Sequence, residues 1–292
     1  MNFLLDKFVK QYKVKKKEKI SMKTVCVITG GGSGMGLAAA KCMPKEKIIV
    51  VTGRTMSKLE KAVKELEALG YEAYAKTCDT SNRQQVRELA EYAASLGEIK
   101  NVINSAGLSP AMAKPEQLIR VNALGTVYVN EEFSKLMKAG SVIVDVSSNS
   151  AYILPSIVVN KKVFALADKN EELFVKKILG LPNMLKGYQA SGLAYGLSKK
   201  FVIWYAAKSA QDLGAKGIRV CSLSPGLIAT DMGNLEAEEG GDLIKTTAER
   251  RMGRPEELGF AIATVADERN GYLAGVDVLV DGGSVTGKEF VK

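Results

Sequence analysis

Two side chains in the second half of the chain have the types and spacing to transfer a proton together. Tyr195 and Lys199 are four residues apart, and residues at that spacing lie on the same face of a helix. An ammonium group near a phenol favours the phenolate and lowers the pKa of the tyrosine from its usual value of about 10. Such a tyrosine can act as general acid in ketone reduction and as general base in alcohol oxidation.

The composition leaves few other groups for this chemistry. The chain of 292 residues contains no histidine, which excludes serine–histidine and cysteine–histidine pairs and the HExxH zinc helix. Proton transfer must therefore use Tyr, Lys, Asp, Glu or Cys. The four cysteines lie far apart and form no CxxC pair. We expect no metal site, and we expect reduced thiols in a cytoplasmic protein.

A cluster of glycines in the first quarter of the chain has the composition of a phosphate-binding loop. Residues 29–36 read TGGGSGMG. Glycines permit a tight turn and the close approach of a pyrophosphate, whose charge meets the N-terminus of a helix. The alternative is a flexible turn that binds nothing. An apolar run before the loop and an alanine-rich segment after it favour the dinucleotide site, because they predict a strand and a helix.

The elements that must position these residues alternate between strand and helix. Apolar runs rich in β-branched residues predict strands over residues 24–29, 48–52, 72–78, 99–104, 141–147, 218–223 and 276–280. Helical periodicity predicts helices over residues 36–43, 56–69, 82–96, 115–137, 191–213 and 255–266. We therefore expect an α/β fold, with a single doubly wound Rossmann-like parallel sheet and helices on both faces.

Motifs along the chain resemble the short-chain dehydrogenase/reductase family. The glycines of the loop follow the family's TGxxxGxG spacing and not GxGxxG. Further motifs occur in the family's order over residues 24 to about 283: Asp79, Asn104-Ser105-Ala106-Gly107, Asn122, Ser148, Tyr195 with Lys199, Ser224-Pro225-Gly226 with Thr230, and Asp281-Gly282-Gly283. Motifs in this number and order are very specific together.

The resemblance implies a catalytic set of four residues. Tyr195 would be the acid and base, and Lys199 would lower its pKa and bind the nicotinamide ribose. Ser148 would hydrogen-bond the substrate oxygen and stabilise its developing negative charge. Asn122 would hold a proton-relay water near Lys199. The neighbouring Ser147 is a rival for the serine role, but the family pattern places the catalytic serine second in this pair.

The resemblance also implies a nicotinamide dinucleotide cofactor. Residues from most of these motifs would bind it: Gly30, Ser33, Gly34, Met35, Gly36, Arg54, Asp79, Asn104, Ala106, Gly107, Tyr195, Lys199, Pro225, Gly226, Ile228 and Thr230. Arg54 follows the second strand, where an acidic residue would repel a 2′-phosphate. Arg54 could pair with that phosphate, which favours NADP(H) over NAD(H). It could also stack on the adenine or point into solvent, and residues 31–33 add no second basic group.

The chain departs from the family between two members of the catalytic set. Ser148 and Tyr195 are 47 positions apart, whereas the family usually separates them by about a dozen residues. The insertion, at about residues 156–186, is rich in apolar side chains. It would lie beside the substrate mouth or on a subunit contact, or its apolar side would pack on the body. A bulky apolar substrate such as a hydroxysteroid is expected, and residues 233–242 would form a mobile lid.

The net charge of +9 is concentrated at the N-terminus. Residues 1–23 hold eight lysines against two acidic residues, and the nearly balanced remainder predicts no nucleic-acid partner. Residues 1–22 form a basic amphipathic extension before a single domain over residues 23–292. We expect the extension to dock on the body or on another subunit, or to stay solvated. Stable membrane insertion is not expected, because six apolar side chains bind lipid weakly.

Together these features predict an NAD(P)-dependent oxidoreductase that interconverts a ketone and a secondary alcohol. Its partners would be a small-molecule substrate and further copies of itself in a dimer or tetramer. Two alternatives stay open. A 3-oxoacyl thioester reductase would need a basic patch for an acyl carrier, whereas the insertion mixes both charge signs. A dinucleotide-binding regulator with little turnover would not need the intact catalytic set.

Overall fold

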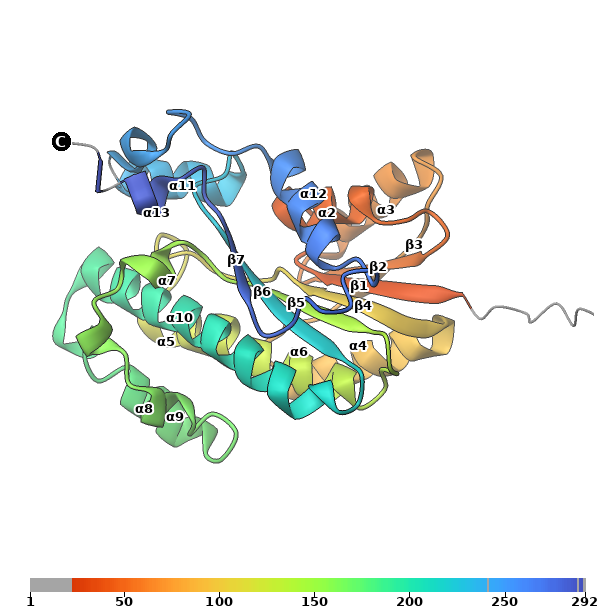
Figure 1. Cartoon of the computed structure of the whole chain (residues 1–292), viewed down its shortest axis with the longest axis horizontal. Helices are drawn as coiled ribbons and strands as arrows, with labels where there is room; N and C mark the ends of the chain where they lie inside the picture. Colours follow the sequence, from red (N-terminus) through yellow and green to blue (C-terminus); the bar gives the residue numbers. More distant parts are fainter. Residues whose placement is uncertain (1–22, 241, 288, 291–292) are drawn as a thin grey trace, which may run out of the picture.

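The computed structural model describes residues 23–240, 242–287 and 289–290 (Figure 1). The basic extension over residues 1–22 therefore lies outside the described residues, and the expectations for it stay predictions. Within residues 236–243 only the backbone is described, and residue 241 is not described at all.

Seven parallel strands form one sheet in the order β3-β2-β1-β4-β5-β6-β7. The strands are β1 (Thr24–Thr29), β2 (Ile48–Gly53), β3 (Glu72–Thr77), β4 (Glu98–Asn104), β5 (Val142–Val146), β6 (Arg219–Pro225) and β7 (Asp277–Val280). Thr29 at the end of β1 pairs with Thr52 on one side and Asn104 on the other. The predicted doubly wound parallel sheet is confirmed, and its carboxyl edge brings the loops after β1, β2 and β4 together.

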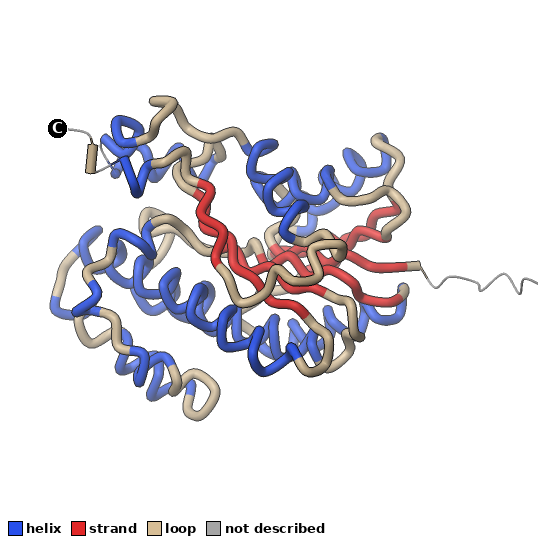
Figure 2. The backbone as a smooth tube through the Cα atoms, viewed as in Figure 1, coloured by secondary structure: helices blue, strands red, loops and turns tan. Residues whose placement is uncertain are grey.

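Helices cover both faces of the sheet (Figure 2). Side chains alternate along β1, so that Val25 and Val27 face one core and Cys26 and Ile28 face the other. The helices on the second core are α2 (Gly34–Cys42), α3 (Met56–Ala68) and α12 (Pro255–Val265). The helices on the first core are α4 (Arg83–Leu96), α5 (Pro115–Leu118), α6 (Gly125–Ser134) and α10 (Gly187–Gly214).

The helix expected over residues 115–137 is not α-helical throughout. A π-helical turn, η1 (Ile119–Leu124), separates α5 from α6, and α6 ends at Ser134. Such a turn widens the helix locally and is frequent at functional sites. Its backbone is tied down by the Thr126 hydroxyl, which donates to the Asn122 carbonyl over 2.9 Å. The predicted helix is confirmed over residues 115–134, and its π-helical turn was not predictable because α- and π-helical turns leave nearly the same apolar spacing in a sequence.

The short helix α7 (Ser150–Ile153) precedes the insertion, which forms α8 (Lys161–Phe164), α9 (Glu171–Ile178) and two short 3₁₀ turns, η2 (Ser156–Val158) and η3 (Pro182–Met184). In Figure 1, α8 and α9 lie on the outer side of α10, away from the sheet. Phe164 and Phe174 are fully buried there, and their ring centroids lie 5.4 and 5.0 Å from that of Phe201 on α10. Three placements were left open for the apolar side of the insertion, and these two phenylalanines pack on the body of the protein.

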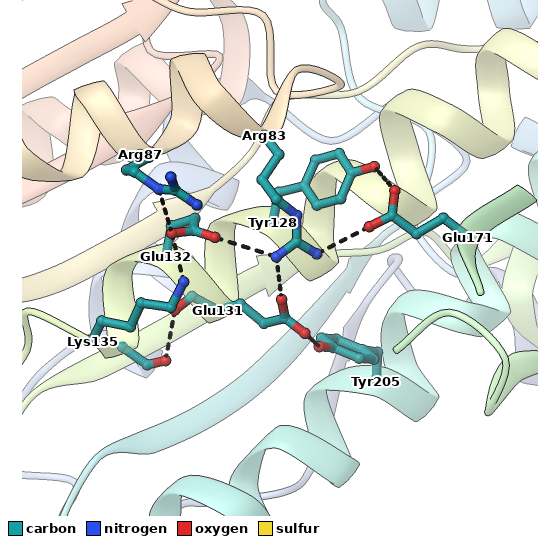
Figure 3. Close-up of polar contacts among 9 residues, drawn as sticks. Arg83, Arg87, Tyr128, Glu131, Glu132, Lys135, Glu171 and Tyr205 are labelled. Carbon is teal, nitrogen blue, oxygen red and sulfur yellow. Dashed lines mark hydrogen bonds and ion pairs between the residues drawn. The ribbon is translucent and has the colours of Figure 1, made fainter. Parts of the chain in front are cut away.

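A charged cluster holds the insertion against the helices beneath it (Figure 3). The guanidinium of Arg83 bonds the Glu131 carboxylate at 2.6 Å and the Glu171 carboxylate of α9 at 3.1 Å. Glu171 also accepts the Tyr128 hydroxyl at 2.6 Å. The Arg83 guanidinium lies 4.6 Å from the centre of the Tyr128 ring. These contacts join α9 to α4 and α6, so the insertion is anchored by polar as well as aromatic contacts.

The segment after β6 lies above the carboxyl edge of the sheet. It contains α11 (Asp231–Gly240) and the 3₁₀ turn η4 (Asp242–Thr246), and α13 (Ser284–Gly287) packs against η4. The hydroxyls of Thr246 and Ser284 lie 2.8 Å apart. The expected lid over residues 233–242 is therefore mostly helical, and the C-terminal α13 contacts the turn that follows it.

Candidate active site

A cleft runs along the carboxyl edge where β1 and β4 are neighbours and the strand order reverses. It consists of a cavity of about 440 Å³ and a second of about 160 Å³. Both are lined by Gly30, Ala106, Gly107 and Leu108. In doubly wound sheets, ligands bind at this switch point. Two cavities that meet at the glycine loop suit the two halves of a dinucleotide.

The glycine loop fits a pyrophosphate. Gly30 has φ of +67°, which side chains disfavour, and a Cβ on Gly36 would lie 2.5 Å from the Gly30 carbonyl oxygen. The loop leads into the N-terminus of α2, whose first turn carries no acidic residue. Ser33 precedes that helix without a side-chain capping bond and lines the larger cavity with Gly34, Met35 and Gly36. The N-terminus of α2, with its dipole, therefore suits an anion, and its own first turn carries no competing carboxylate.

The smaller cavity collects the residues expected near the adenosine. Arg54 and Asp79 both line it. The Asp79 carboxylate accepts bonds from the backbone N–H and the hydroxyl of Ser81, at 2.9 and 2.7 Å. Lys58 lines neither cavity but lies beside the glycine loop, because a Cβ on Gly32 would be 3.5 Å from the Lys58 Cβ. Sequence reasoning missed Lys58, although its spacing of four residues from Arg54 is visible in the sequence.

Tyr195 and Lys199 line the larger cavity from α10. The Lys199 ammonium lies 5.8 Å from the centre of the Tyr195 ring, and it donates to the Val146 carbonyl over 3.0 Å. Lys199 is 6% exposed, so its charge is poorly screened. A Cβ on Gly107 would lie 3.4 Å from the Lys199 nitrogen and 3.2 Å from the Asn122 amide oxygen. The lysine is thus held at the point where β5, the loop after β4 and η1 converge.

The two serines after β5 have different partners. The Ser147 hydroxyl donates to the Lys199 carbonyl over 2.7 Å, which ties β5 to α10. The Ser148 hydroxyl accepts the Ser150 N–H over 3.2 Å, so it keeps its own proton for donation. Both residues line the larger cavity. The hydrogen-bonding pattern favours Ser148 as the donor to a substrate oxygen.

Two candidate residues lie behind the cavity wall. Asn122, in η1, accepts the Leu108 N–H at 2.8 Å and donates to the Leu108 carbonyl at 3.0 Å. It also donates to the Ser198 hydroxyl at 3.2 Å. Asn104 is 5% exposed and accepts the Thr29 hydroxyl at 2.9 Å. Both asparagines therefore position the loop that lines the cavity, and their direct contact with a ligand stays a prediction.

The loop after β6 closes the far side of the cavity. Pro225, Gly226, Ile228 and Thr230 line it, as predicted for the cofactor site. The Gly226 N–H bonds the Val280 carbonyl at 3.0 Å. Residues 149–194, all of which are described, do not line this cavity. The expectation that the insertion lies beside the substrate mouth therefore finds no support in the larger cavity.

A further titratable group missed by sequence reasoning is buried beside the site. Asp145 lies in β5, is fully buried, and accepts bonds from Asn104 and Asn130 at 3.0 and 2.8 Å. Burial raises the pKa of its carboxyl to about 7, against the lowering effect of the two asparagines and of Lys199. The signal in the sequence is the single acidic residue within the apolar run of β5.

Among the described residues, no group of three or more Cys, Asp or Glu side chains could hold a metal ion. None of the helices in the same part of the chain is long and apolar enough to cross a membrane.

Comparisons with known proteins agree with this geometry. One matching family model is described as short chain dehydrogenase, over residues 24–159, and another as Enoyl-(Acyl carrier protein) reductase, over residues 178–285. The stretch between them falls within the insertion.

Individual relatives match along most of the chain. A short-chain dehydrogenase/reductase of Alternaria brassicicola, bsc3, is 29% identical and covers 91% of this chain and 97% of its own. Cyclohexanol dehydrogenase of an Acinetobacter species is 27% identical, over 88% and 93%. A solved short-chain type dehydrogenase/reductase from Mycobacterium ulcerans is 25% identical with a TM-score of 0.70, over 90% of each chain. The chain therefore belongs to the short-chain dehydrogenase/reductase family, and it is an oxidoreductase that acts on a CH–OH group with a nicotinamide dinucleotide.

Proposed function

We propose that the protein interconverts a ketone and a secondary alcohol, with Tyr195 as the general acid and base. The observation that carries this proposal is the meeting of Tyr195, Lys199 and Ser148 in the cavity that the glycine loop also lines. In a chain without histidine, a phenol beside a buried ammonium is a chemically suitable proton donor at neutral pH.

Each of these side chains would have one task. Ser148 donates a hydrogen bond to the substrate oxygen and stabilises the negative charge that develops there. Tyr195 gives its phenolic proton to that oxygen in reduction and takes it back in oxidation. Lys199, fixed by the Val146 carbonyl, stabilises the phenolate. Bound nicotinamide supplies or accepts the hydride. Asn122 maintains the loop geometry, and we keep its role beside a proton-relay water as part of the proposal.

We propose an apolar ketone or alcohol as the substrate, with hydroxysteroids as the class to test first. Support comes from Leu108, Val146, Ile228 and Met232, which line the larger cavity. The apolar side chains of the insertion give no support, because they pack on α10. The printed name of one relative, cyclohexanol dehydrogenase, makes cyclic secondary alcohols the second class to test.

Reduction of 3-oxoacyl thioesters is the second candidate function. It is favoured by the family model for residues 178–285, whose description names an acyl carrier protein reductase. Against it, residues 231–242 carry five acidic residues and no basic one. The first of them, Asp231, lines the larger cavity, where a carboxylate would repel the anionic carrier. A dinucleotide-binding regulator with little turnover is the third reading, and it leaves the catalytic set without a task.

The first experiment offers the enzyme ketosteroids, small cyclic ketones and acetoacetyl thioesters with NADPH or NADH, and follows absorbance. We expect turnover of ketones, and we expect Tyr195→Phe to lower kcat about 10²- to 10⁴-fold without weakening cofactor binding. Tyr205→Phe on the same helix is the matched control, because Tyr205 does not line the cavity. Full activity of Tyr195→Phe would refute the assignment of the acid, and turnover of thioesters alone would favour the second candidate.

We propose NADP(H) as the preferred cofactor. Arg54 and Lys58 flank the first turn of α3, and that turn contains no acidic residue. The helix N-terminus and two cations would together suit a 2′-phosphate.

Steady-state kinetics of Arg54→Gln tests this preference. The variant should raise KM for NADPH about tenfold, the worth of one charge-assisted hydrogen bond, and change KM for NADH less than twofold. Lys64→Gln, further along α3, should change neither. Equal effects of Arg54→Gln on both cofactors would instead place Arg54 on the adenine, which the two share.

We further propose that residues 23–292 act as one domain, in the cytoplasm, in a homo-oligomer. Two exposed aromatic side chains support the assembly: Phe260 on α12 is 69% exposed, and Tyr272 before β7 is fully exposed. Large exposed apolar groups of this kind often mark subunit contacts. Light scattering of the full chain would measure the number of subunits, and Phe260→Lys should reduce that number.

A further inference from the structure

A buried polar chain leads from Asp145 to both sides of the active site. The Asp145 carboxylate accepts a bond from the Asn104 amide nitrogen at 3.0 Å. The same nitrogen donates to the Thr126 hydroxyl at 3.2 Å, and the Asn104 oxygen accepts the Thr29 hydroxyl at 2.9 Å. Thr29 in turn accepts the Ala106 N–H at 3.0 Å. Ala106 lines both cavities of the cleft.

The ionised carboxylate fixes the direction of every bond in this chain. A carboxylate can only accept, so Asn104 must turn its NH₂ towards Asp145 and its oxygen towards Thr29. Thr29 must then donate to Asn104, which leaves its lone pair for the Ala106 N–H. On the other branch Thr126 accepts from Asn104, so its own proton goes to the Asn122 carbonyl. One charge therefore determines the hydrogen bonds of the loop after β4 and of η1.

A neutral Asp145 would not impose this direction. A protonated carboxyl must donate one bond. If it donates to a flipped Asn104, the Asn104 oxygen faces the Thr126 hydroxyl, which can then give its proton to Asn104 instead of the Asn122 carbonyl, and Thr29 accepts from Asn104 instead of donating to it. If it donates to Asn130, the Asn104 branch of the chain survives, because the Asn130 amide can flip to turn towards Asp145 an oxygen that has no other hydrogen-bond partner. The ionised state thus allows one arrangement and the neutral state allows two.

The groups around Asp145 leave it as the titrating member of this network. Lys199 and Tyr205 from α10 and Cys221 from β6 are the ionisable groups that interact with it. Burial raises the pKa of both Tyr205 and Cys221, and so keeps them neutral near pH 7. The side chains that face it from β4 and α6 are the neutral Asn104 and Asn130.

We propose that Asp145 is a positioning residue whose carboxylate sets the hydrogen-bond direction that holds Ala106 at the cofactor cavity and the Asn122 turn beside Lys199. The proposal rests on the proposed function for its effect on turnover, but its effect on cofactor binding does not require a substrate. Asp145 touches neither cavity, so its influence is exerted through Asn104.

The test compares Asp145→Asn with the wild type from pH 5.5 to 8.5. The asparagine has the same shape and stays neutral, so it mimics the protonated carboxyl. Two quantities are measured at each pH: Kd for NADPH by fluorescence titration, and kcat for a ketone. We expect the two proteins to agree within twofold at pH 5.5. At pH 8.5 the variant should bind NADPH about threefold more weakly and turn over about fivefold more slowly.

Asn101→Ala is the matched control. Asn101 lies in β4, is fully buried, and bonds the Ala266 carbonyl away from this network. Its effects should not vary with pH. The proposal would be overturned if the wild-type to Asp145→Asn ratio stayed constant over the pH range both for Kd of NADPH and for kcat. If the wild type turned over no ketone, the proposed function would fail, and the pH dependence of NADPH binding would still decide the role of Asp145.

Discussion

Adjacent side chains can have unrelated tasks, and the two serines after β5 show how the hydrogen-bond partner decides between them. The Ser147 hydroxyl donates its hydrogen bond to the Lys199 carbonyl. The Ser148 hydroxyl accepts one from the Ser150 N–H, so its own proton stays available for a substrate. Sequence reasoning selected Ser148 from the family pattern alone. The partners supply a physical reason for the same choice.

Alanine substitutions at the two positions separate the tasks. Ser148→Ala should lower kcat about 10²-fold, because it removes a donor to the developing negative charge. Ser147→Ala should lower kcat less than tenfold and reduce thermal stability instead, because it loses a tie between β5 and α10. Steady-state kinetics and thermal unfolding of both variants provide the readout. The reverse ranking of the two kcat values would move the catalytic role to Ser147.

The residues that were predictable from sequence are those whose chemistry is written in local motifs. The glycine loop, Tyr195 and Lys199 all carry such motifs, and all line the larger cavity. Lys58 and Asp145 belong to no motif. Their importance comes from neighbours that the fold supplies: the glycine loop beside Lys58, and two asparagines from other elements around Asp145.

At the scale of elements, the insertion shows why apolar content alone does not locate a segment. Its hydrophobic residues are compatible with a substrate mouth, a subunit contact or the body of the protein. The choice depends on the outer face of α10, where Phe201, Trp204 and Tyr205 form an aromatic surface. That face can be recognised only when the orientation of the helix on the sheet is known.

Removal of one aromatic ring tests the docking of the insertion. Phe174→Ala should lower the free energy of unfolding by about 3 kcal/mol, as expected for a fully buried phenylalanine. Ile157→Ala, in the same insertion but at a position 91% exposed, should change it by less than about 0.5 kcal/mol. Urea denaturation measures both. If Phe174→Ala kept its stability but no longer turned over the substrate, the insertion would instead have to lie at the mouth of the active site.

For the molecule as a whole, strand–helix alternation was sufficient to predict the doubly wound sheet, because the central strands β1, β2 and β5 are buried along nearly their whole length. The pH dependence of stability was not predictable, since it depends on buried charges. The ion pairs of Glu132 with Lys135 and Arg87 outweigh its burial and lower its pKa. That contribution is present above the ordinary value of about 4.5 and is lost as the pH falls.

Asp145 acts in the opposite direction on the alkaline side. Its pKa is raised from 3.8 to about 7 by burial, so its contribution is present in acid and is lost as the pH rises through 7. The full effect is up to about 4 kcal/mol. We expect maximal stability near pH 4 to 5, because the contribution of Asp145 falls steadily between its ordinary pKa of 3.8 and its raised pKa of about 7. Thermal unfolding should show the wild type losing stability from about pH 4.5 to 7 and then levelling off, while Asp145→Asn stays level over the same range. Parallel curves would contradict this assignment.

The enclosed carboxyl of Asp145 also couples proton exchange to ligand binding. If ionisation of Asp145 tightens cofactor binding, then cofactor binding must by reciprocity promote its ionisation and release protons into the medium. In most proteins histidine side chains also exchange protons near pH 7 and mask such a release, but this chain has no histidine. Calorimetric titrations with NADPH in buffers of different ionisation enthalpy would count the protons. The difference between wild type and Asp145→Asn would then belong to one carboxyl group.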